Sequence, residues 1–218
     1  MLKKYMNKLS RNRMIHAINY GKDSGVSYGG TKYQYGYHSL DFGGITFKGQ
    51  RNNKSRISQM SYNFDNKVVF DIGCNSGGVL HILSDVIKYG IGVDKSSKLV
   101  NVANMIKSLN GENNINFYTF DLDNEALPFL ENFLLEIVKV DVVLFLSMAK
   151  WVKKWKDVVS FCKSIAPVLI FESNGAPKQQ TNQEAFLKSV YKNCYLKSSK
   201  SIDDPGQINR RLFVCGDD

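Results

Sequence analysis

VVFDIGCNSGG, residues 68–78, is an apolar run that passes through a glycine turn into the helical pattern VLHILSDVI. The run has the length and the apolar content of a buried strand. Gly73 and Gly77 let the backbone turn tightly after the strand, and they let a ligand approach without meeting a Cβ atom. Strand, glycine turn and helix in this order predict the opening βαβ unit of an α/β domain.

The rest of the chain beyond residue 67 repeats the alternation of strand and helix. The runs YGIGVD, INFYTFD, VDVVLFLS and PVLIFES follow, with helical patterns near 77–89, 96–109, 125–136, 151–165 and 181–193. This alternation predicts a doubly wound, Rossmann-like α/β fold with helices on both faces of a parallel sheet. The last two runs, 195–201 and 210–215, leave no room for a helix between them. We therefore expect them to form an antiparallel hairpin that makes the sheet mixed.

The positive charge of the chain is concentrated in its first 60 residues. The 218 residues carry 29 Lys and Arg against 20 Asp and Glu, and residues 1–60 hold 11 basic and two acidic side chains. An amphipathic helix is predicted over 2–20, followed by a Gly- and Tyr-rich stretch over 28–49. We predict a basic, substrate-binding extension or lid over 1–60 and one globular domain over 61–218. The alternative is that the basic residues only solvate the first helix.

Composition and cysteine spacing exclude several classes of protein. The chain has 43% hydrophobic residues, which is enough for a sizeable core, and it has no run of about 18 uncharged apolar residues. No apolar segment follows the basic N-terminus, so we expect a cytoplasmic protein without a membrane partner. The four cysteines form no Cys-x-x-Cys pair and no His stands at ligand spacing. We therefore expect no metal site, no disulfide and reduced, mostly buried thiols.

An aspartate closes each of the first three strands of the predicted domain. Asp71 precedes the glycine turn, Asp94 ends the second strand and Asp121 ends the third. The carboxyl ends of parallel strands meet at one edge of the sheet, where ligands bind, so these carboxylates are expected to converge. Asp71 would repel the pyrophosphate of a dinucleotide, but it suits the sulfonium and ammonium of S-adenosylmethionine (SAM). Asp94 would then bind the ribose and Asp121 the adenine; the alternative is that each Asp caps a helix.

The same residues resemble the motifs of the class I SAM-dependent methyltransferases. D-I-G-C-N-S-G, 71–77, resembles their first motif, G-V-D, 92–94, their ribose ligand, and D-L-D, 121–123, their adenine contact. The resemblance covers about 67–215 and implies a seven-stranded mixed sheet whose last strand is antiparallel. It also implies SAM as cofactor and S-adenosylhomocysteine (SAH) as product. The cofactor residues it implies are Asp71, Gly73, Asn75, Gly77, Asp94, Lys95, Asp121 and Leu122.

The substrate side resembles the methylphosphate capping enzymes, which methylate phosphate at RNA 5′ ends. S-M-A-K-W, 147–151, is similar to their S-x-x-K-W segment. K-Y-Q-Y-G-Y, 32–37, together with the arginines that follow it, is similar to their tyrosine-rich segment and its arginines. By this resemblance the catalytic residues are Ser147, Lys150 and Glu172. The acceptor would be bound by Tyr35, Tyr37, Arg51, Arg56, Trp151 and Asn174.

Two aromatic patterns have a purely structural alternative. Tyr33, Tyr35 and Tyr37 alternate at period two, so they would share one face of a strand and could stack on a base or on each other. Trp151 and Trp155 fall on one stripe of the helix predicted over 151–165. We expect Trp155 to pack in the core, whereas Trp151, at the end of a strand, stays a substrate contact.

Three functions follow from these residues. The first is methyl transfer from SAM to an oxygen of an anionic acceptor such as an RNA 5′ phosphate, which is already ionised and only has to be held in line. The second is O-methylation of a sugar or a phosphorylated small molecule. A sugar hydroxyl needs a general base, for which Glu172, Asp121 and His38 are candidates. The third is a non-catalytic SAM-fold module that binds RNA or protein. Under the first, Arg51→Ala or Arg56→Ala would abolish transfer and spare SAM binding.

Overall fold

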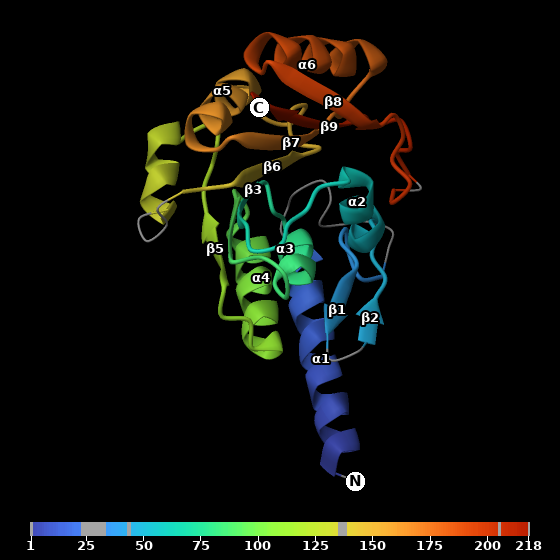
Figure 1. Cartoon of the computed structure of the whole chain (residues 1–218). Coiled ribbons are helices and arrows are strands. Elements are labelled where there is room, and N and C mark those ends of the chain that lie inside the picture. Colours follow the sequence, from blue (N-terminus) through green and yellow to red (C-terminus); the bar gives the residue numbers. More distant parts are fainter. Residues whose placement is uncertain (1, 23–33, 43–44, 135–138, 205, 218) are drawn as a thin grey trace.

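The computed structural model describes residues 2–22, 34–42, 45–134, 139–204 and 206–217 (Figure 1). Its helices are α1 (Leu2–Lys22), α2 (Asn53–Met60), α3 (Gly78–Leu83), α4 (Ser97–Asn110), the 3-10 helix η1 (Leu127–Leu134), α5 (Trp155–Ile165) and α6 (Pro177–Val190). Its strands are β1 (Leu40–Phe42), β2 (Ile45–Phe47), β3 (Val68–Ile72), β4 (Tyr89–Asp94), β5 (Ile115–Thr119), β6 (Val142–Leu146), β7 (Val168–Glu172), β8 (Asn193–Ser198) and β9 (Leu212–Gly216).

One seven-stranded sheet forms the body of the molecule, in the order β5-β4-β3-β6-β7-β9-β8. The pairs from β5 to β7 are parallel, whereas β9 runs antiparallel to both β7 and β8. The prediction of a Rossmann-like, seven-stranded mixed sheet with the last strand antiparallel is therefore confirmed. The expected hairpin is the β8–β9 pair.

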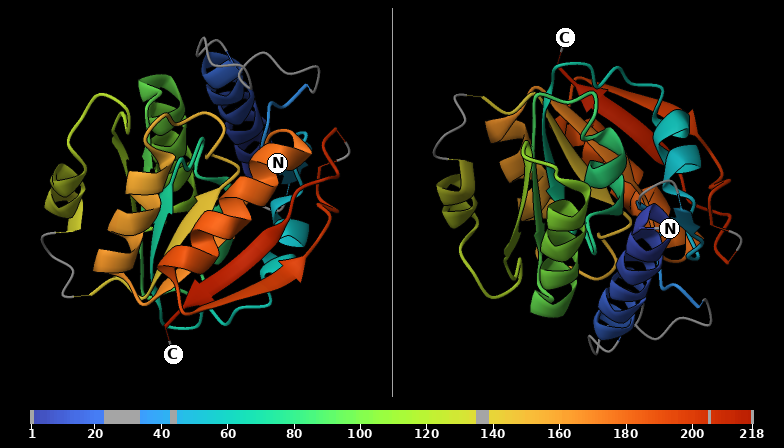
Figure 2. Two further views of the ribbon diagram at one scale, coloured as in Figure 1. Left: turned by 90° about the horizontal axis from the view of Figure 1, so that it is seen from above. Right: turned by 90° about the horizontal axis from the view of Figure 1, so that it is seen from below.

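Helices cover both faces of this sheet (Figure 2). One apolar core packs η1, α5 and α6 against the sheet, and a second core packs α2, α3 and α4 against the other face. Every residue of β3 and β6 is buried, because each face of these central strands lies under a helix. The continuous apolar runs in the sequence reflect this double burial.

The N-terminal extension packs onto the sheet domain at two places. Helix α1 lies along α4, where Met14 and Ile18 share a small core with Phe47 and Ile106 (Figure 1). Helix α2 contacts α3 and the β8–β9 pair. The helix expected over 2–20 is present, and the boundary at residue 60 stays a prediction. Residues 23–33 of the Gly- and Tyr-rich stretch, with Tyr33, lie outside the described residues.

Helix α5 begins at Trp155, four residues later than the apolar stripe predicts. The carboxylate of Asp123 accepts hydrogen bonds from the backbone N–H groups of Lys153 and Lys154, at 2.8 and 3.3 Å, which holds this segment as a turn. Trp155 packs against the core, as expected. Trp151 lies outside the helix and is 41% exposed, because this contact between distant segments sets the helix start.

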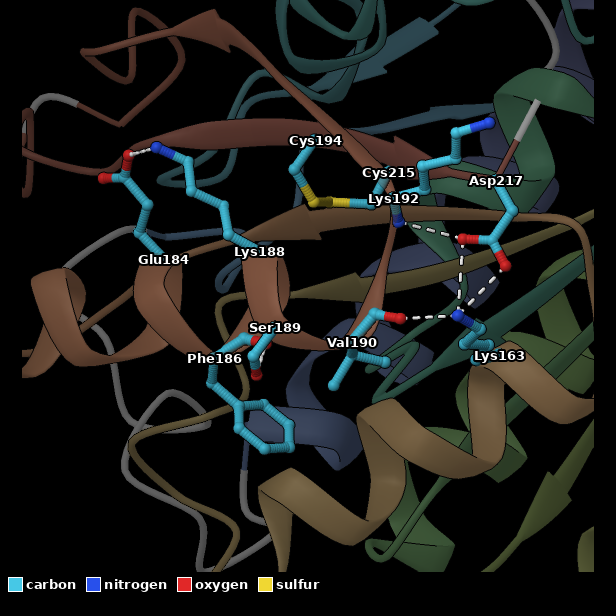
Figure 3. Close-up of a disulfide and its surroundings, with 10 residues drawn as sticks. All are labelled: Lys163, Glu184, Phe186, Lys188, Ser189, Val190, Lys192, Cys194, Cys215 and Asp217. Carbon is cyan, nitrogen blue, oxygen red and sulfur yellow. Dashed lines mark hydrogen bonds and ion pairs between the residues drawn. A yellow bond between two sulfur atoms is a disulfide. The ribbon is translucent and has the colours of Figure 1, made fainter.

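A disulfide joins Cys194 on β8 to Cys215 on β9, which corrects the expectation that all four thiols are reduced (Figure 3). The two residues face each other in the antiparallel register of the hairpin, and their Cα atoms are 4.1 Å apart. Such directly opposed positions bring Cβ atoms within reach of a disulfide. The spacing of cysteines along the sequence carries no sign of this register. Cys74 and Cys162 are free and buried, as expected.

Within the described ranges, no helix combines the length and apolar character needed to cross a membrane. The same residues contain no group of three or more His, Cys, Asp or Glu side chains that could hold a metal ion.

Candidate active site

The glycine turn after β3 adopts a backbone that its sequence makes possible. Gly73, Asn75 and Gly77 have φ angles of 83, 53 and 74°, in the left-handed region that glycine and asparagine adopt most readily. The N–H groups of Gly73 and Cys74 donate to the carbonyl oxygen of Val93, at 2.8 and 3.0 Å, and so fix the turn to the end of β4. A Cβ on Gly73 would lie 2.5 Å from the sulfur of Met148, so a larger residue would displace the flexible Met148 side chain in addition to straining the backbone at this positive φ.

Asp94, at the end of β4, is fixed by the same turn. Its two carboxylate oxygens accept hydrogen bonds from the N–H groups of Asn75 and Ser96, both at 2.9 Å. Burial raises the pKa of Asp94, although these two hydrogen bonds oppose the shift. Each oxygen keeps a second lone pair, so the carboxylate can still accept hydrogen bonds from the two hydroxyls of a ribose.

One pocket collects most of the predicted cofactor residues at the carboxyl ends of β3, β4 and β5. Its lining includes Gly73, Asp94, Lys95, Asp121 and Leu122. The pocket is also lined by four residues for which no cofactor role was predicted: Phe120, Met148, Trp151 and Val152. Apolar walls with carboxylates at the edge fit the flat adenine and the ribose of SAM. Trp151, predicted as a substrate contact, therefore lies on the cofactor pocket.

Asp121 has a structural role in addition to its place in this pocket. Its carboxylate accepts hydrogen bonds from the side chain of Asn124 and the N–H of Asp123, at 2.8 and 2.9 Å. The bond from Asn124 comes first among the causes that lower the pKa of Asp121. The Asp121 carboxylate thus stabilises the turn 121–124, and the neighbouring Asp123 binds the segment before α5; neither of these contacts caps the helix that follows in the sequence, η1.

Asp71 is buried on β3, directly before the glycine turn. Burial raises its pKa to about 7; Arg56 acts against this shift, and Asp94 adds to it. A cation placed beside Asp71 would favour the ionised carboxylate. The ammonium group of SAM is such a cation, so the residues around the turn fit this cofactor.

Three arginine side chains converge on Ser147, the residue that follows β6. The hydroxyl oxygen of Ser147 accepts hydrogen bonds from Arg51 Nη1 at 3.2 Å, Arg56 Nη2 at 3.3 Å and Arg210 Nη1 at 3.0 Å. The Ser147 hydroxyl donates to the carboxylate of Glu172. Ser147 has a φ of 61°, an unfavourable conformation of the kind that persists where surrounding contacts fix it, often at functional sites.

Glu172, at the end of β7, is held between these arginines. Arg51 binds both carboxylate oxygens, at 2.8 and 3.0 Å, and Arg56 binds Oε2 at 2.5 Å. Burial by itself would raise the pKa of Glu172, but Arg56 and Arg51 hold it well below its usual range. A carboxylate this strongly stabilised is a poor proton acceptor, so the structure argues against Glu172 as a general base.

Arg51, predicted as a substrate contact, is enclosed by acidic partners in the structure. Its side chain is fully buried and also binds the carboxylate of Asp203, at 2.6 and 3.0 Å. Asp204 in turn pairs with Arg210 at 3.2 Å. No part of the Arg51 guanidinium faces solvent, so Arg51 positions Glu172 and Ser147. Asp203 and Asp204 lie between the last two predicted strands, and Arg210 begins the last one; nothing in the local sequence pattern relates these residues to β6 and β7.

The remaining predicted residues lie around the same strand ends. The side chain of Asn174 donates to the Ser147 carbonyl oxygen at 2.5 Å and accepts from the N–H of Lys150 at 2.8 Å, so it fixes this loop. The ammonium group of exposed Lys150 lies 4.7 Å from the ring centre of Trp151.

Tyr35 and Tyr37, the two described tyrosines of the alternating 33–37 pattern, face different surroundings. The Tyr37 hydroxyl accepts from both Arg51 and Arg210 at 3.3 Å, whereas Tyr35 packs against Phe47. Gly36, with a φ of 82°, breaks the strand alternation that would have put them on one face.

The fold is that of the class I SAM-dependent methyltransferases. Residues 70–171 match a family described as a methyltransferase domain. The match makes SAM the methyl donor, and the turn, Asp94 and the adjoining pocket fit this cofactor. No curated protein matches the sequence.

Solved structures with a similar fold include two that are described as methyltransferases and one that was solved with SAH bound. The N-terminal domain of EvdMO1, solved with SAH bound, is 9% identical, covers 97% of this chain and 96% of its own, and has a TM-score of 0.64. The bifunctional kinase-methyltransferase WbdD is 15% identical over 78% of this chain and 40% of its own, with a TM-score of 0.60. PH1948 of Pyrococcus horikoshii, whose description suggests an RNA methyltransferase, is 14% identical over 74% and 80%, with a TM-score of 0.53. At these identities the likeness is one of fold.

Proposed function

We propose that this chain transfers the methyl group of SAM to an oxygen of an anionic acceptor, a phosphate group first of all. The observation that carries the proposal is the state of Glu172. It is the carboxylate nearest Ser147, and arginines hold it ionised and fully hydrogen-bonded. An acceptor that is already ionised needs no base, whereas a hydroxyl does.

The acceptor must be held in line with the bond that breaks. SAM supplies an electrophilic methyl carbon; the acceptor oxygen bonds to it as the carbon–sulfur bond breaks and the electron pair stays on sulfur. The exposed ammonium of Lys150 lies over Trp151 at the edge of the cofactor pocket, and Lys95 lines that pocket. These cations can hold an anionic group about 3 to 3.5 Å from the methyl carbon. Asn174 fixes the backbone of Lys150 for this task.

A sugar hydroxyl is the second candidate acceptor, and His38 favours it. Burial, followed by Arg56 and Arg51, lowers the pKa of His38 well below its usual value, so the ring is neutral at pH 7. Its Nδ1 is buried and has no hydrogen-bond partner among the described residues. A neutral imidazole can accept the hydroxyl proton, although the lowered pKa makes His38 a weaker base than an ordinary histidine. The EvdMO1 domain was also solved in the presence of SAH and D-fucose, with 9% identity and a TM-score of 0.61.

The experiment that tests the proposal measures transfer of tritium from labelled SAM into two acceptor pools. One pool is RNA from the source organism, with and without phosphatase treatment; the other is its small-molecule fraction, treated in the same way. Label that disappears after phosphatase supports a phosphate acceptor, in whichever pool it is found. Label that survives phosphatase would replace it with the hydroxyl candidate and make His38→Ala the next variant.

The controls separate an enzyme from a binding module. Asp94→Asn should lose transfer together with SAM binding, whereas Asp157→Asn, an exposed acid on α5, should lose neither. SAM binding without transfer to either pool would favour the non-catalytic module.

A further inference from the structure

A groove between the turn after β6 and helix α6 adjoins the cofactor pocket. Lys150, Trp155 and Lys156 line it on one side, and Asn182, Gln183 and Phe186 of α6 line it on the other. Helices α5 and α6 lie side by side on this face of the sheet (Figure 2). We refer to this feature, defined by those six residues, as the α6 groove. The proposed function leaves it without a role.

The α6 groove is connected to the active site by a short path. Val152 lines both the groove and the cofactor pocket, so the turn 148–152 is the wall between them. Gln183 exchanges two hydrogen bonds with the backbone of Asn174, at 3.1 and 2.9 Å. The side chain of Asn174 then binds the carbonyl oxygen of Ser147. A molecule in the groove therefore lies beside the loop that presents the acceptor.

The groove offers polar groups that the protein itself does not use. Within the described residues, no hydrogen bond is formed by the exposed side chain of Asn182. The ammonium of Lys156 lies 5.9 Å from the ring centre of Trp155 and 5.3 Å from that of Phe186, and within the same residues it forms no ion pair. An amide can donate to one hydroxyl and accept from another, and the ammonium can bind an anionic oxygen.

The aromatic residues argue against single-stranded nucleic acid in this groove. Trp155 and Phe186 are half-buried and meet edge to face, with ring centres 5.2 Å apart and an angle of 79°. Lys156 lies above both rings. Binding of RNA uses open ring faces for base stacking and several phosphate contacts. Partly covered rings, amide groups and two lysines, rather than a row of open rings and phosphate-binding cations, suit a hydroxyl-rich molecule instead.

We propose that the α6 groove binds the saccharide part of a phosphorylated sugar acceptor. This inference rests on the proposed function and names its substrate class. The phosphate would lie at Lys150, beside the methyl donor, and the sugar hydroxyls would contact Asn182 and Lys156.

The two tryptophans of the chain allow a test that needs no turnover. Trp151 lines the cofactor pocket and Trp155 lines the groove, so their indole N–H signals in a nitrogen-15 NMR spectrum report on the two sites separately. SAH should shift the signal of Trp151. The probes for the groove are the 1-phosphates of glucose, mannose, galactose and fucose, the free sugars, and a 5′-phosphorylated oligoribonucleotide.

The expected result is that at least one sugar phosphate shifts Trp155 and binds about tenfold more weakly to Asn182→Ala and to Lys156→Ala, because each loses one polar contact. Lys178→Ala, on the same helix but outside the groove, should bind as the unmodified chain does.

If SAH shifts the Trp151 signal but no sugar phosphate shifts the Trp155 signal, the inference is overturned and the proposed function stays intact. A shift of Trp155 by the oligoribonucleotide alone replaces the saccharide with RNA. Absence of the SAH shift at Trp151 overturns both proposals.

Discussion

Arg51 and Glu172 form a fully buried, two-pronged ion pair between the N-terminal segment and the end of β7. Nη2 lies 2.8 Å from Oε1 and Nη1 lies 3.0 Å from Oε2. The residues are 121 positions apart in the sequence, so this pair ties the predicted substrate extension to the sheet. It also makes Glu172 unavailable as a base, on which the proposed phosphate acceptor rests.

Arg51→Ala should destabilise the chain by about 3–5 kcal/mol, because the buried carboxylate of Asp203 loses its arginine and that of Glu172 keeps Arg56 as its only arginine within hydrogen-bond distance. Arg51→Lys should recover little, since an ammonium cannot replace the forked guanidinium contacts. Urea unfolding measures both effects. The control is Arg211→Ala, which removes a partly exposed pair with Glu184 and should cost less than about 1 kcal/mol. If Arg51→Ala and Arg211→Ala lose the same free energy of unfolding, the buried ion pairs of Arg51 contribute no more to stability than a surface pair does.

Asp94→Asn should weaken SAM binding about 10- to 100-fold while the chain stays folded. The amide keeps the shape of the carboxylate, but it loses the charge and one acceptor that the two ribose hydroxyls would use. Isothermal titration calorimetry with SAM and SAH measures the change. Unchanged affinity would show that Asp94 serves only to hold the turn through Asn75 and Ser96.

SAM affinity should rise with pH up to about 7 and level off above it. Asp71 has a pKa of about 7 in the folded chain, so below that pH the ammonium of SAM has to displace its proton. The slope approaches tenfold per pH unit between about 5 and 7. Asp71→Asn should abolish this pH dependence and bind SAM weakly throughout. A pH-independent affinity in the unmodified chain would remove Asp71 from the cofactor site.

Asp71 also determines how the free energy of unfolding changes with pH. Between pH 4 and 7 the folded chain keeps the proton on Asp71, whereas the unfolded chain has lost it, because the unfolded pKa is 3.8. This group therefore lowers the free energy of unfolding by about 1.4 kcal/mol per pH unit as the pH rises through that range. The free energy of unfolding, measured with urea at a series of pH values, should fall more steeply with pH by this amount in the unmodified chain than in Asp71→Asn. Above pH 7 the two curves should run parallel.

Removal of the disulfide should cost about 3 kcal/mol, the chain-entropy value for a loop of 21 residues. The double variant Cys194→Ser, Cys215→Ser and the reduced chain should lose similar stability. The double variant should not lose further stability in reductant, whereas Cys162→Ala, which removes a buried free thiol and keeps the disulfide, should respond to reductant as the unmodified chain does. Alkylation of all four cysteines without reductant in the denatured chain would contradict the disulfide.

The sequence carried enough information for the fold because that information is local. The runs around Phe70 and Leu144 are apolar throughout, as strands covered on both faces must be, and the glycines of the turn mark positions with positive φ. The aspartate at the end of β4 could be placed from strand order alone, because parallel strands end at one edge. The cofactor side of the site was therefore predictable.

The acceptor side depends on contacts between distant segments. Ser147 was identified from its segment, but the meeting of Arg51, Arg56 and Arg210 around it joins three parts of the chain. No periodicity encodes such a meeting, so the buried ion pairs of Arg51 and Arg56 could not be predicted, and their part in binding the acceptor stays a prediction. The register that pairs Cys194 with Cys215 was hidden for the same reason.

By itself, the sequence determined the order of strands and helices, the glycine turn and the carboxylates at the strand ends, since these follow from patterns within about ten residues. Only the tertiary structure decided which charges neutralise one another, where α5 begins and which tryptophan faces the cofactor pocket. The physical reason is that burial and charge pairing depend on what packs against a side chain, and those neighbours come from elsewhere in the chain.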